Sequence, residues 1–202
     1  MPANPNVAEE EPSSLPIVDR LAGGGAVLVG PWLLGLSVAL PTDHDLVARR
    51  SIASSYDWLA DAFVAALEGV GVASRRAGAQ EARKASPELA WACFAGITAG
   101  EVLVDARKLV GFAQRRNRHG ILIVAGLLLD AVPWWPLCAR MLAAHPAHEI
   151  TAQAQTLAGS TIDLSSAAGT RGRTLNAAAE DAGRVDALTD RAKKLGAKGL
   201  VW

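Results

Sequence analysis

Lys108 is the residue whose setting most favours a chemical role, because it opens an otherwise apolar stretch that runs to Ala113. A lysine is expensive to bury unless its ammonium group meets an anion. A buried lysine that reaches an acyl carbonyl or a phosphate would stabilise the negative charge that develops during group transfer. The alternative is a surface lysine at a turn, with its stem on apolar neighbours and its ammonium group in water.

Cys93 is a second candidate, as a nucleophile that carries an acyl group as a thioester. Its reactivity would depend on a nearby group that favours the thiolate, and Lys108 or the backbone amides of a loop are two candidates for that group. The alternative is a small buried hydrophobic residue. The other cysteine, Cys138, stands in an apolar segment with Leu137 and Met141, and we expect it in the core.

Arg20 precedes a run of three glycines, Gly23 to Gly25, which is followed by Ala26. Glycines let the backbone adopt positive φ angles and let a ligand lie directly on its N–H groups. Such amides can hold a carboxylate or phosphate oxygen, and Arg20 could add charge-assisted hydrogen bonds. The alternative is a plain turn at the end of a strand.

Composition excludes some classes of function. The 202 residues suffice for one domain with a sizeable core. Lysine plus arginine and aspartate plus glutamate balance at 20 each, so charge gives no case for binding nucleic acid or an anionic membrane surface. The two cysteines form no CxxC pair and the four histidines show no ligand spacing, so we expect no metal site. Lone cysteines without a recognisable signal peptide indicate a reducing cytoplasm.

The stretch 21–42 contains no charged residue and is long enough to cross a bilayer. It also contains seven glycines and prolines, which make a poor helix. The Gly30-Pro31 pair is typical of a turn between two buried strands, over 26–29 and 33–40. A small membrane-associated protein is the alternative interpretation of this stretch.

Strands and helices are expected in clusters rather than in strict alternation, which favours an α+β fold over a doubly wound sheet. Apolar residues between Ile52 and Leu67 recur at helical spacing, which predicts a helix that starts at Thr42 or Asp43 and ends at Gly69. Further strands are expected over 16–20 and 120–129 and in a hairpin of 101–104 and 108–114. Further helices are expected over 133–144 and 173–195, a loop over 74–87, and a loop with a short element over 156–170.

The segments Arg20–Val27 and Arg107–Gln114, in this order and separated by a long helix, resemble the lipoate–protein ligase and octanoyltransferase family. That family shows Arg-x-x-Gly-Gly-Gly-Ala-Val followed by Gly-Arg-Lys-x-x-Gly-x-Ala-Gln. The Cys93-Phe94 pair, with Glu101 eight residues after the cysteine, is similar to the octanoyltransferase branch, in which the cysteine carries the octanoyl group as a thioester. The resemblance covers about residues 16–130 and is strongest in the lysine segment.

The resemblance implies a mixed, mainly antiparallel sheet flanked by helices, as in biotin/lipoate protein-ligase catalytic domains. It implies catalytic roles for Lys108, which would contact the acyl carbonyl, and for Cys93. It also implies a pocket for lipoate, octanoate or the acyl-adenylate. The residues that would line this pocket are Arg20, Gly23, Gly24, Gly25, Ala26, Gly111, Ala113 and Gln114.

The acceptor implied by the resemblance is a lysine on a lipoyl carrier domain, either the E2 subunit of a 2-oxoacid dehydrogenase or the H protein of the glycine cleavage system. A ligase would use ATP and Mg²⁺, whereas a transferase would take the acyl group from a carrier or another protein. We expect a cytoplasmic monomer with a disordered tail over 1–15 and a catalytic domain over 16–145. Residues 146–202 would add a loop and a helix to the same domain.

A second function from another class stays open: a non-catalytic relative that binds a lipoyl domain or a fatty-acyl ligand. It depends on two departures from the family pattern. Val124-Ala125-Gly126 stands where the family usually has a histidine before the glycine, and only 19 residues precede Arg20, where the family has a strand and a helix.

Overall fold

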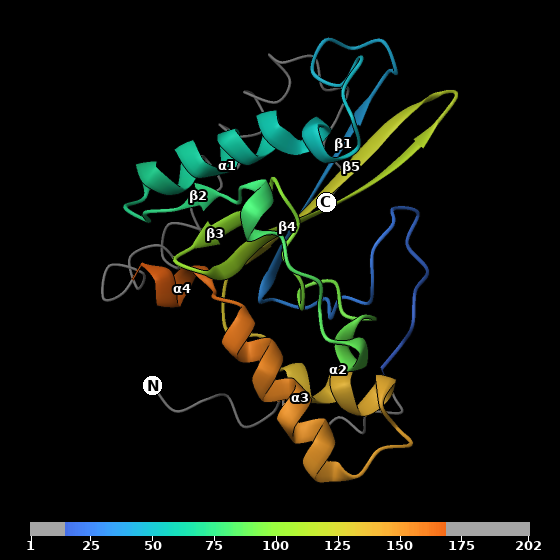
Figure 1. Cartoon of the computed structure of the whole chain (residues 1–202), viewed down its shortest axis with the longest axis vertical. Helices are drawn as coiled ribbons and strands as arrows, with labels where there is room; N and C mark the ends of the chain where they lie inside the picture. Colours follow the sequence, from blue (N-terminus) through green and yellow to red (C-terminus); the bar gives the residue numbers. More distant parts are fainter. Residues whose placement is uncertain (1–14, 169–202) are drawn as a thin grey trace.

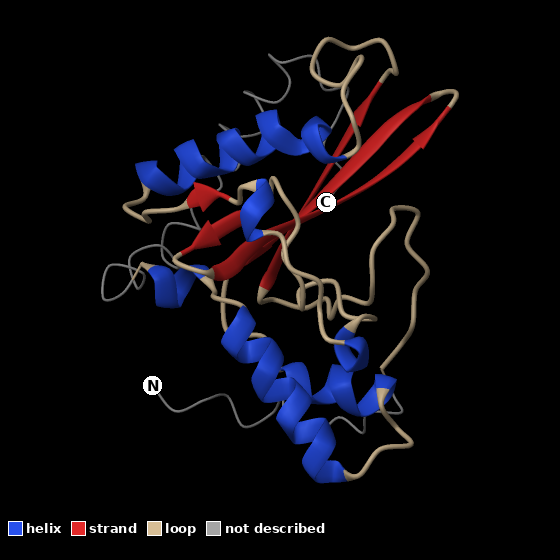
Figure 2. Ribbon diagram, viewed as in Figure 1, coloured by secondary structure: helices blue, strands red, loops and turns tan. Residues whose placement is uncertain are grey.

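A five-stranded antiparallel sheet in the order β1-β5-β4-β3-β2 organises the computed structural model, which describes residues 15–168 (Figure 1, Figure 2). Long β4 and β5 form a hairpin, and Asn117 Oδ1 closes its turn by accepting hydrogen bonds from the backbone of His119 and Gly120, at 2.8 and 3.1 Å. The strands are β1 (Leu33–Leu40), β2 (Arg75–Arg76), β3 (Val102–Val104), β4 (Arg107–Asn117) and β5 (Gly120–Leu128).

The predicted α+β fold with a mainly antiparallel sheet is confirmed. Every strand pairing in the sheet is antiparallel, and the parallel contacts of the described residues are isolated bridges, Ala26 with Ala92 and Lys108 with Thr161. The strand over 33–40, the 101–114 hairpin and the strand from Gly120 form close to their predicted bounds. Their apolar runs between turn residues were sufficient to locate them.

One face of the sheet packs against helix α1 (Asp57–Gly69), which follows a short 3-10 turn over Ala53–Tyr56 (Figure 1). Phe112 of β4 is the meeting point, because its ring stacks on Tyr56 at 5.6 Å and meets Phe63 edge-on at 5.9 Å, between ring centroids. The larger apolar core of the described residues lies between this helix and the alternate residues of β1, β4 and β5.

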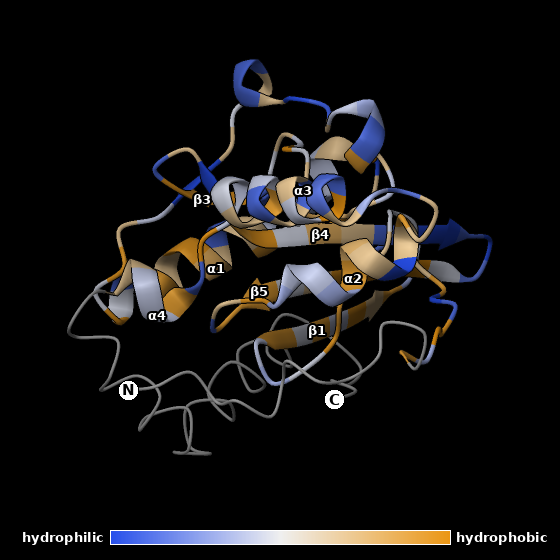
Figure 3. Ribbon diagram, turned by 90° about the horizontal axis from the view of Figure 1, so that it is seen from below, coloured by the Kyte–Doolittle hydropathy of each residue, from blue (hydrophilic) through white to orange (hydrophobic). Residues whose placement is uncertain are grey.

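The opposite face carries glycines where the first face carries large side chains. Gly35, Gly126 and Gly111 are paired in register across β1, β5 and β4. The ring of Phe94 rests on this row, 3.5 Å from where a Cβ would stand at Gly111 or Gly126. A second apolar cluster continues from Phe94 to Leu128 and into the helices α2 (Trp134–Met141) and α3 (Ala147–Ser160). Figure 3 shows these two helices beside the sheet, coloured by hydropathy.

A β-bulge at the start of β4 turns Lys108 out of the large core. Val102 of β3 pairs with Val110, whereas the next residue, Leu103, pairs with Lys108, so Leu109 is the extra residue. Leu109 and Val110 are consecutive, yet both belong to the core beneath α1. Bulges of this kind re-aim the neighbouring side chain, and they are common next to functional sites.

Three predictions about the first 56 residues are wrong. No strand forms over 16–20 or over 26–29, because these segments find no partner strand beyond the single bridge at Ala26. The helix predicted from Thr42 or Asp43 begins only at Asp57. Arg49 has a φ angle of 58°, in the left-handed region, which no α-helix passes through.

The C-terminal part differs too. The predicted helix over 133–144 is confirmed as α2. Of the loop with a short element predicted over 156–170, the short element is α4 (Leu164–Ala167), but the first residues are helical, because α3 extends to Ser160. The predicted loop over 74–87 contains the short strand β2. All but the last residue of the predicted tail over 1–15, and the whole predicted helix over 173–195, lie outside the described residues. No helix within 15–168 is long and apolar enough to cross a membrane.

Candidate active site

The run of three glycines is fastened beside Cys93 by backbone hydrogen bonds. Ala26 N donates to Trp91 O at 2.6 Å, and Cys93 N donates to Ala26 O at 3.0 Å. Gly24 has a φ angle of 100°, which favours glycine. A Cβ on Gly25 would collide with the carbonyl oxygen of Trp91. Glycine is therefore required at both positions, and the loop backbone lies directly against the cysteine segment.

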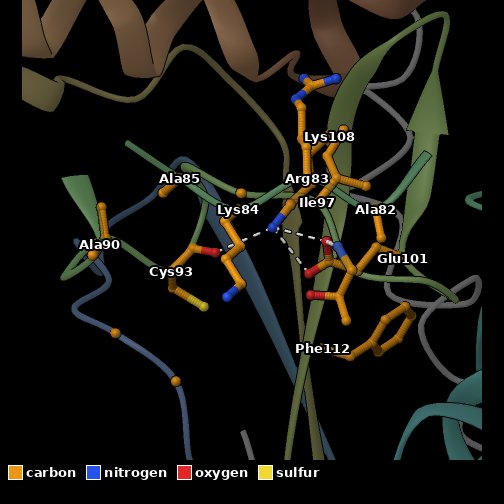
Figure 4. Close-up of a pocket in the computed structure, with 15 residues that line it drawn as sticks. Ala82, Arg83, Lys84, Ala85, Ala90, Cys93, Ile97, Glu101, Lys108 and Phe112 are labelled. Carbon is orange, nitrogen blue, oxygen red and sulfur yellow. Dashed lines mark hydrogen bonds and ion pairs between the residues drawn. The ribbon is translucent and has the colours of Figure 1, made fainter. Parts of the chain in front are cut away.

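Lys108 is buried, with 1% of the residue exposed, which excludes the surface-lysine alternative. Its ammonium Nζ lies 2.9 Å from each carboxylate oxygen of Glu101 and donates to the Cys93 carbonyl oxygen at 3.1 Å (Figure 4). The Nζ also stands 5.5 Å from the centroid of the Phe94 ring. The ion pair thus ties the backbone of the cysteine segment to β4.

Glu101 is the site residue that the sequence analysis named only as a family signature and gave no role. It is buried, and its carboxylate also accepts a hydrogen bond from Thr98 N at 2.8 Å. Burial raises the pKa of Glu101 above its ordinary value, while the charge of Lys108 and the Thr98 N–H oppose this rise. A glutamate just before an apolar strand that contains a lysine was the available signal.

The two cysteines have opposite settings. Cys93 is partly exposed, and Nη2 of Arg20 lies 3.7 Å from its Sγ while the same nitrogen donates to Gly25 O at 2.8 Å. Cys138 is fully buried in the second apolar cluster, as predicted, and burial raises the pKa of Cys138 to about 11. Only Cys93 has the access and the cationic neighbour that a reactive thiol needs.

These groups line one pocket of about 640 Å³ (Figure 4). Gly24, Gly25 and Cys93 form one wall, and Glu101 and Lys108 form another. The segment from Ala82 to Ala85 closes a third side, because Arg83 pairs with Ile97 through two backbone hydrogen bonds of 2.8 and 2.9 Å. The pocket therefore brings the predicted glycine run, cysteine and lysine together from three distant parts of the chain.

Residues 4–134 match the lipoyl protein ligase A/B catalytic domain family, and this range is more than half of the chain. The chain belongs to that family. The family is one of lipoyl and octanoyl transfer to lipoyl carrier domains. A search of curated proteins finds no matching relative.

Other predicted residues of this lipoyl ligase-family site lie beside the pocket rather than on its wall. Gly23 N donates to Gln114 O at 3.4 Å, and Gly111 supports Phe94 from below. The Gln114 side chain turns toward the start of the 3-10 turn that precedes α1, where it donates to Ile52 O at 2.8 Å. Ala113 is buried next to it. These residues support the site through the backbone and through packing.

Ligases of the family use ATP and Mg²⁺, but the described residues of the pocket offer few groups that could bind Mg²⁺. Among the described residues that line the pocket, Glu101 is the only carboxylate. Its two oxygens are held by Lys108 and by Thr98 N. Magnesium is bound in proteins by one or two carboxylates together with the phosphates. Glu101 cannot serve Mg²⁺ without releasing Lys108, so the described residues of this pocket do not fit a magnesium–nucleotide site.

Proposed function

We propose that the chain is an acyltransferase that carries an octanoyl or lipoyl group as a thioester on Cys93 and passes it to a lysine of a lipoyl carrier domain. The observation that carries the proposal is the partly exposed Cys93 thiol on the wall of a pocket that also holds the glycine run and Lys108. Among the described residues that line the pocket, Glu101 is the only carboxylate and it is held by Lys108, which favours this version over an ATP-dependent ligase.

The first half of the reaction is acyl transfer to sulfur. The thiolate of Cys93 attacks the carbonyl carbon of a donor thioester or amide, and a tetrahedral oxyanion forms. The oxyanion collapses with expulsion of the donor thiolate or amine, which takes up a proton, and the acyl group remains on sulfur. In the second half, the neutral amine of a carrier lysine attacks this thioester. The new amide forms, the amine proton leaves, and the Cys93 thiolate is released.

The backbone amides of Gly24 and Gly25 are the best-placed donors for the oxyanion. Within the described residues neither amide has a hydrogen-bond partner, although both glycines line the pocket with Cys93. A Cβ at Gly24 would stand only 3.5 Å from Cys93 Sγ. Preorganised amides at such a position are worth about 10²–10³ in rate in other acyl transferases.

Lys108 positions the nucleophile in this proposal. All three of its close oxygen neighbours belong to Glu101 and to the Cys93 carbonyl, so its donors are committed in the free enzyme. A contact with the acyl carbonyl, as the family resemblance implies, stays a prediction. It requires that Lys108 exchange one of these partners when the substrate arrives.

The test is incubation of the protein with an octanoyl-loaded carrier protein, followed by mass spectrometry of the intact chain. We expect an octanoyl adduct that maps to Cys93 and is removed by neutral hydroxylamine. Transfer to a lipoyl carrier domain is then measured without ATP. The matched control is Cys138→Ser, because the other thiol is buried and its raised pKa keeps it protonated.

Cys93→Ala should abolish both the adduct and the transfer, while Cys138→Ser retains both. Full transfer by Cys93→Ala would overturn the proposal, and ATP-dependent formation of lipoyl-adenylate would replace it with a ligase. Binding of the carrier domain without any transfer by the wild-type chain would support the non-catalytic relative.

A further inference from the structure

We propose that the tip of the β4–β5 hairpin is the surface on which an acidic face of the lipoyl carrier domain docks. Four exposed arginines gather there, and together they are termed the hairpin-tip patch: Arg50, Arg115, Arg116 and Arg118. The proposal names the partner contact of the same site and rests on the proposed function. It starts from the charges of the patch, because none of the four arginines forms a salt bridge within residues 15–168.

The charge of the hairpin is one-sided. No acidic residue stands between Asp105 and Asp130, and Figure 3 shows the far end of β4 and its turn as hydrophilic. Arg115 donates no side-chain hydrogen bond to another described residue, and Arg118 Nε meets only the ring of the adjacent His119, at 2.9 Å. Arginines are charged at every physiological pH, so their charges repel one another across this narrow turn. An anionic partner would remove that repulsion.

Arg116 fixes the patch to the body of the protein. Its Nε donates to Gln114 Oε1 at 3.1 Å, and its Nη1 donates to Arg50 O at 3.2 Å. The second bond brings Arg50, from the loop after β1, beside the hairpin. The acidic residues of the same loop, Asp43 and Asp45, line a separate hollow and pair with no member of the patch in the described part of the chain. A surface that is held in this way loses little freedom on binding, which favours affinity.

Arg115 connects the patch to the face of the sheet that carries the site. Side chains alternate along a strand, so Arg115 points to the same face as Gly111, on which the ring of Phe94 rests. Four residues of strand separate the two positions, which is about 14 Å. The residue before Arg115, Gln114, accepts a hydrogen bond from Gly23 N at 3.4 Å through its backbone oxygen, so β4 passes directly beside the glycine run. Arg115 is therefore the next side chain on this face beyond the glycine run.

A docked carrier domain would cover Arg115. The acceptor lysine must approach the thioester on Cys93, so the contact is centred near the pocket. A stable interface covers about 800 Å² on each partner, which is a disc about 32 Å across. Arg115, about 14 Å along β4 from Gly111, falls inside such a disc. Arg118 lies farther out, within about 10 Å of the rim, the distance over which charges act at 0.1 M salt.

The signs of the charges decide the chemistry of the partner. Arg83 and Lys84 add two cations to the pocket wall, and its one carboxylate among the described residues, Glu101, is held by Lys108. A carrier that surrounds its acceptor lysine with further cations would be repelled from this side of the enzyme. A carrier whose acceptor lysine is flanked by aspartate or glutamate would be attracted to the patch and oriented by it. The alternative is a solvated turn that keeps the hairpin soluble, and it predicts no effect on binding.

The experiment measures binding of the full chain to the apo form of the glycine cleavage H protein by isothermal titration calorimetry, at about 0.05 M and about 0.5 M NaCl. The double variant Arg115→Glu with Arg118→Glu turns two attractions into repulsions. Its Kd should exceed that of the wild type by about tenfold at low salt. At 0.5 M NaCl, where the screening length is about 4 Å, the two Kd values should agree within about twofold. The KM for this carrier in the transfer assay should rise in parallel with the Kd.

Arg140→Glu is the matched control, because Arg140 is an exposed arginine of α2 that also lacks an ion pair within the described residues. Figure 1 shows α2 in the lower half of the molecule and the hairpin tip at the top. This variant should bind and transfer like the wild type. Equal affinities of the double variant and the wild type at low salt would overturn the proposal. A difference that persists at 0.5 M NaCl would also overturn it, because that pattern indicates altered folding rather than altered charge.

Two further outcomes would assign the patch to another occupant and so overturn the proposal. A wild-type chain that forms dimers at low salt, while the double variant stays monomeric, would identify a second copy as the occupant. A double variant that binds the H protein normally but is no longer acylated by an octanoyl-loaded carrier protein would identify the donor. Size-exclusion chromatography and intact mass spectrometry detect these two outcomes.

The result is separable from the proposed function. Salt-dependent binding that the double variant loses, together with no acyl adduct on the wild type from any donor, would keep the docking surface and reject the transferase. A normal adduct and normal transfer by the wild type, together with unchanged binding by the double variant, would do the reverse. Far-UV circular dichroism of each variant confirms that the affinities refer to folded protein.

Discussion

The two faces of the sheet differ in the side chains that they carry. The face beneath α1 is filled by large apolar side chains and stacked aromatic rings around Phe112. The other face is bare backbone at Gly35, Gly126 and Gly111, and Phe94 with the Lys108–Glu101 pair covers part of it. One set of strands thus supplies stability on one side and space for chemistry on the other.

The contrast can be followed along β4 alone. Val110 and Phe112 pack toward α1, whereas Lys108 and Gly111 serve the opposite face. The bulge at Leu109 makes this switch within the strand. Phe112 belongs to both sides, because it packs toward α1 and also lines the pocket. Changes elsewhere on the α1 face should cost stability without loss of intrinsic activity, and changes on the other face should affect both or affect activity alone.

The largest effect is expected for Lys108→Met, which leaves Glu101 buried without a cation. Removal of one partner of a buried ion pair costs about 3–5 kcal/mol of unfolding free energy. The cost should be smaller in acid. When the pKa of a carboxyl group is raised in the folded state, the free energy of unfolding of the protein falls as the pH rises through that pKa. It increases again when the carboxyl group is protonated. Urea denaturation between pH 4 and pH 8 measures both effects.

The double variant Lys108→Met with Glu101→Leu is the control for this prediction. It removes both charges, so most of the stability should return. Acyl transfer should be lost in both the single and the double variant, because neither has the hydrogen bond from Lys108 to the Cys93 carbonyl oxygen. A double variant that transfers at the wild-type rate would show that the ion pair only fills space.

A smaller effect, confined to stability, is expected for Leu59→Ala on α1. Leu59 is buried in the large core, and such truncations cost about 2–5 kcal/mol. Because no atom of this residue reaches the pocket, kcat/KM of the folded fraction should equal that of the wild type at a temperature well below the unfolding midpoint. A fall in kcat/KM without a fall in the urea midpoint would break the division between the faces.

The smallest effect is expected for Gly35→Val. A Cβ at Gly35 would meet no atom within 4 Å, and valine is favoured over glycine in strands by about 1 kcal/mol. The thermal midpoint should rise slightly with activity unchanged. Gly126→Val provides the contrast, because a Cβ there stands 3.2 Å from Leu33 and 3.5 Å from the Phe94 ring. Equal midpoints for the two variants would show that Phe94 does not need the glycine row.

The sequence was sufficient where local pattern and tertiary structure agree. The strands over 108–114 and 120–129 are apolar runs on both sides of a polar segment, so each could be located as a strand. The approach of the glycine run, Cys93 and Lys108 could be expected from the family resemblance. The burial of Lys108 could not be expected, because a buried lysine charge is stable only when an anion such as Glu101 compensates it.

Other features depend on contacts that no local pattern reveals. Helix α3 was missed because Ile150 and Leu157 are its only large apolar residues, too few to mark a helical stripe. Its buried points Ile150, Ala154 and Leu157 are stabilised by packing against α2. The contact between Arg20 and Cys93 joins residues from distant parts of the chain. Nothing in the spacing of these residues indicates which cation meets the sulfur.

The bridge between Thr161 and Lys108 has a consequence for the order of events during synthesis. Ile162 N donates to Lys108 O at 3.0 Å, so the peptide of the site lysine is completed by residues outside the matched range 4–134. When residues 4–134 of a nascent chain have emerged from the ribosome, Ile162, whose N–H binds the Lys108 carbonyl oxygen, has not yet emerged. The site can therefore finish folding only after residue 162 has emerged from the ribosome, which is later than the emergence of the last residue of the matched range.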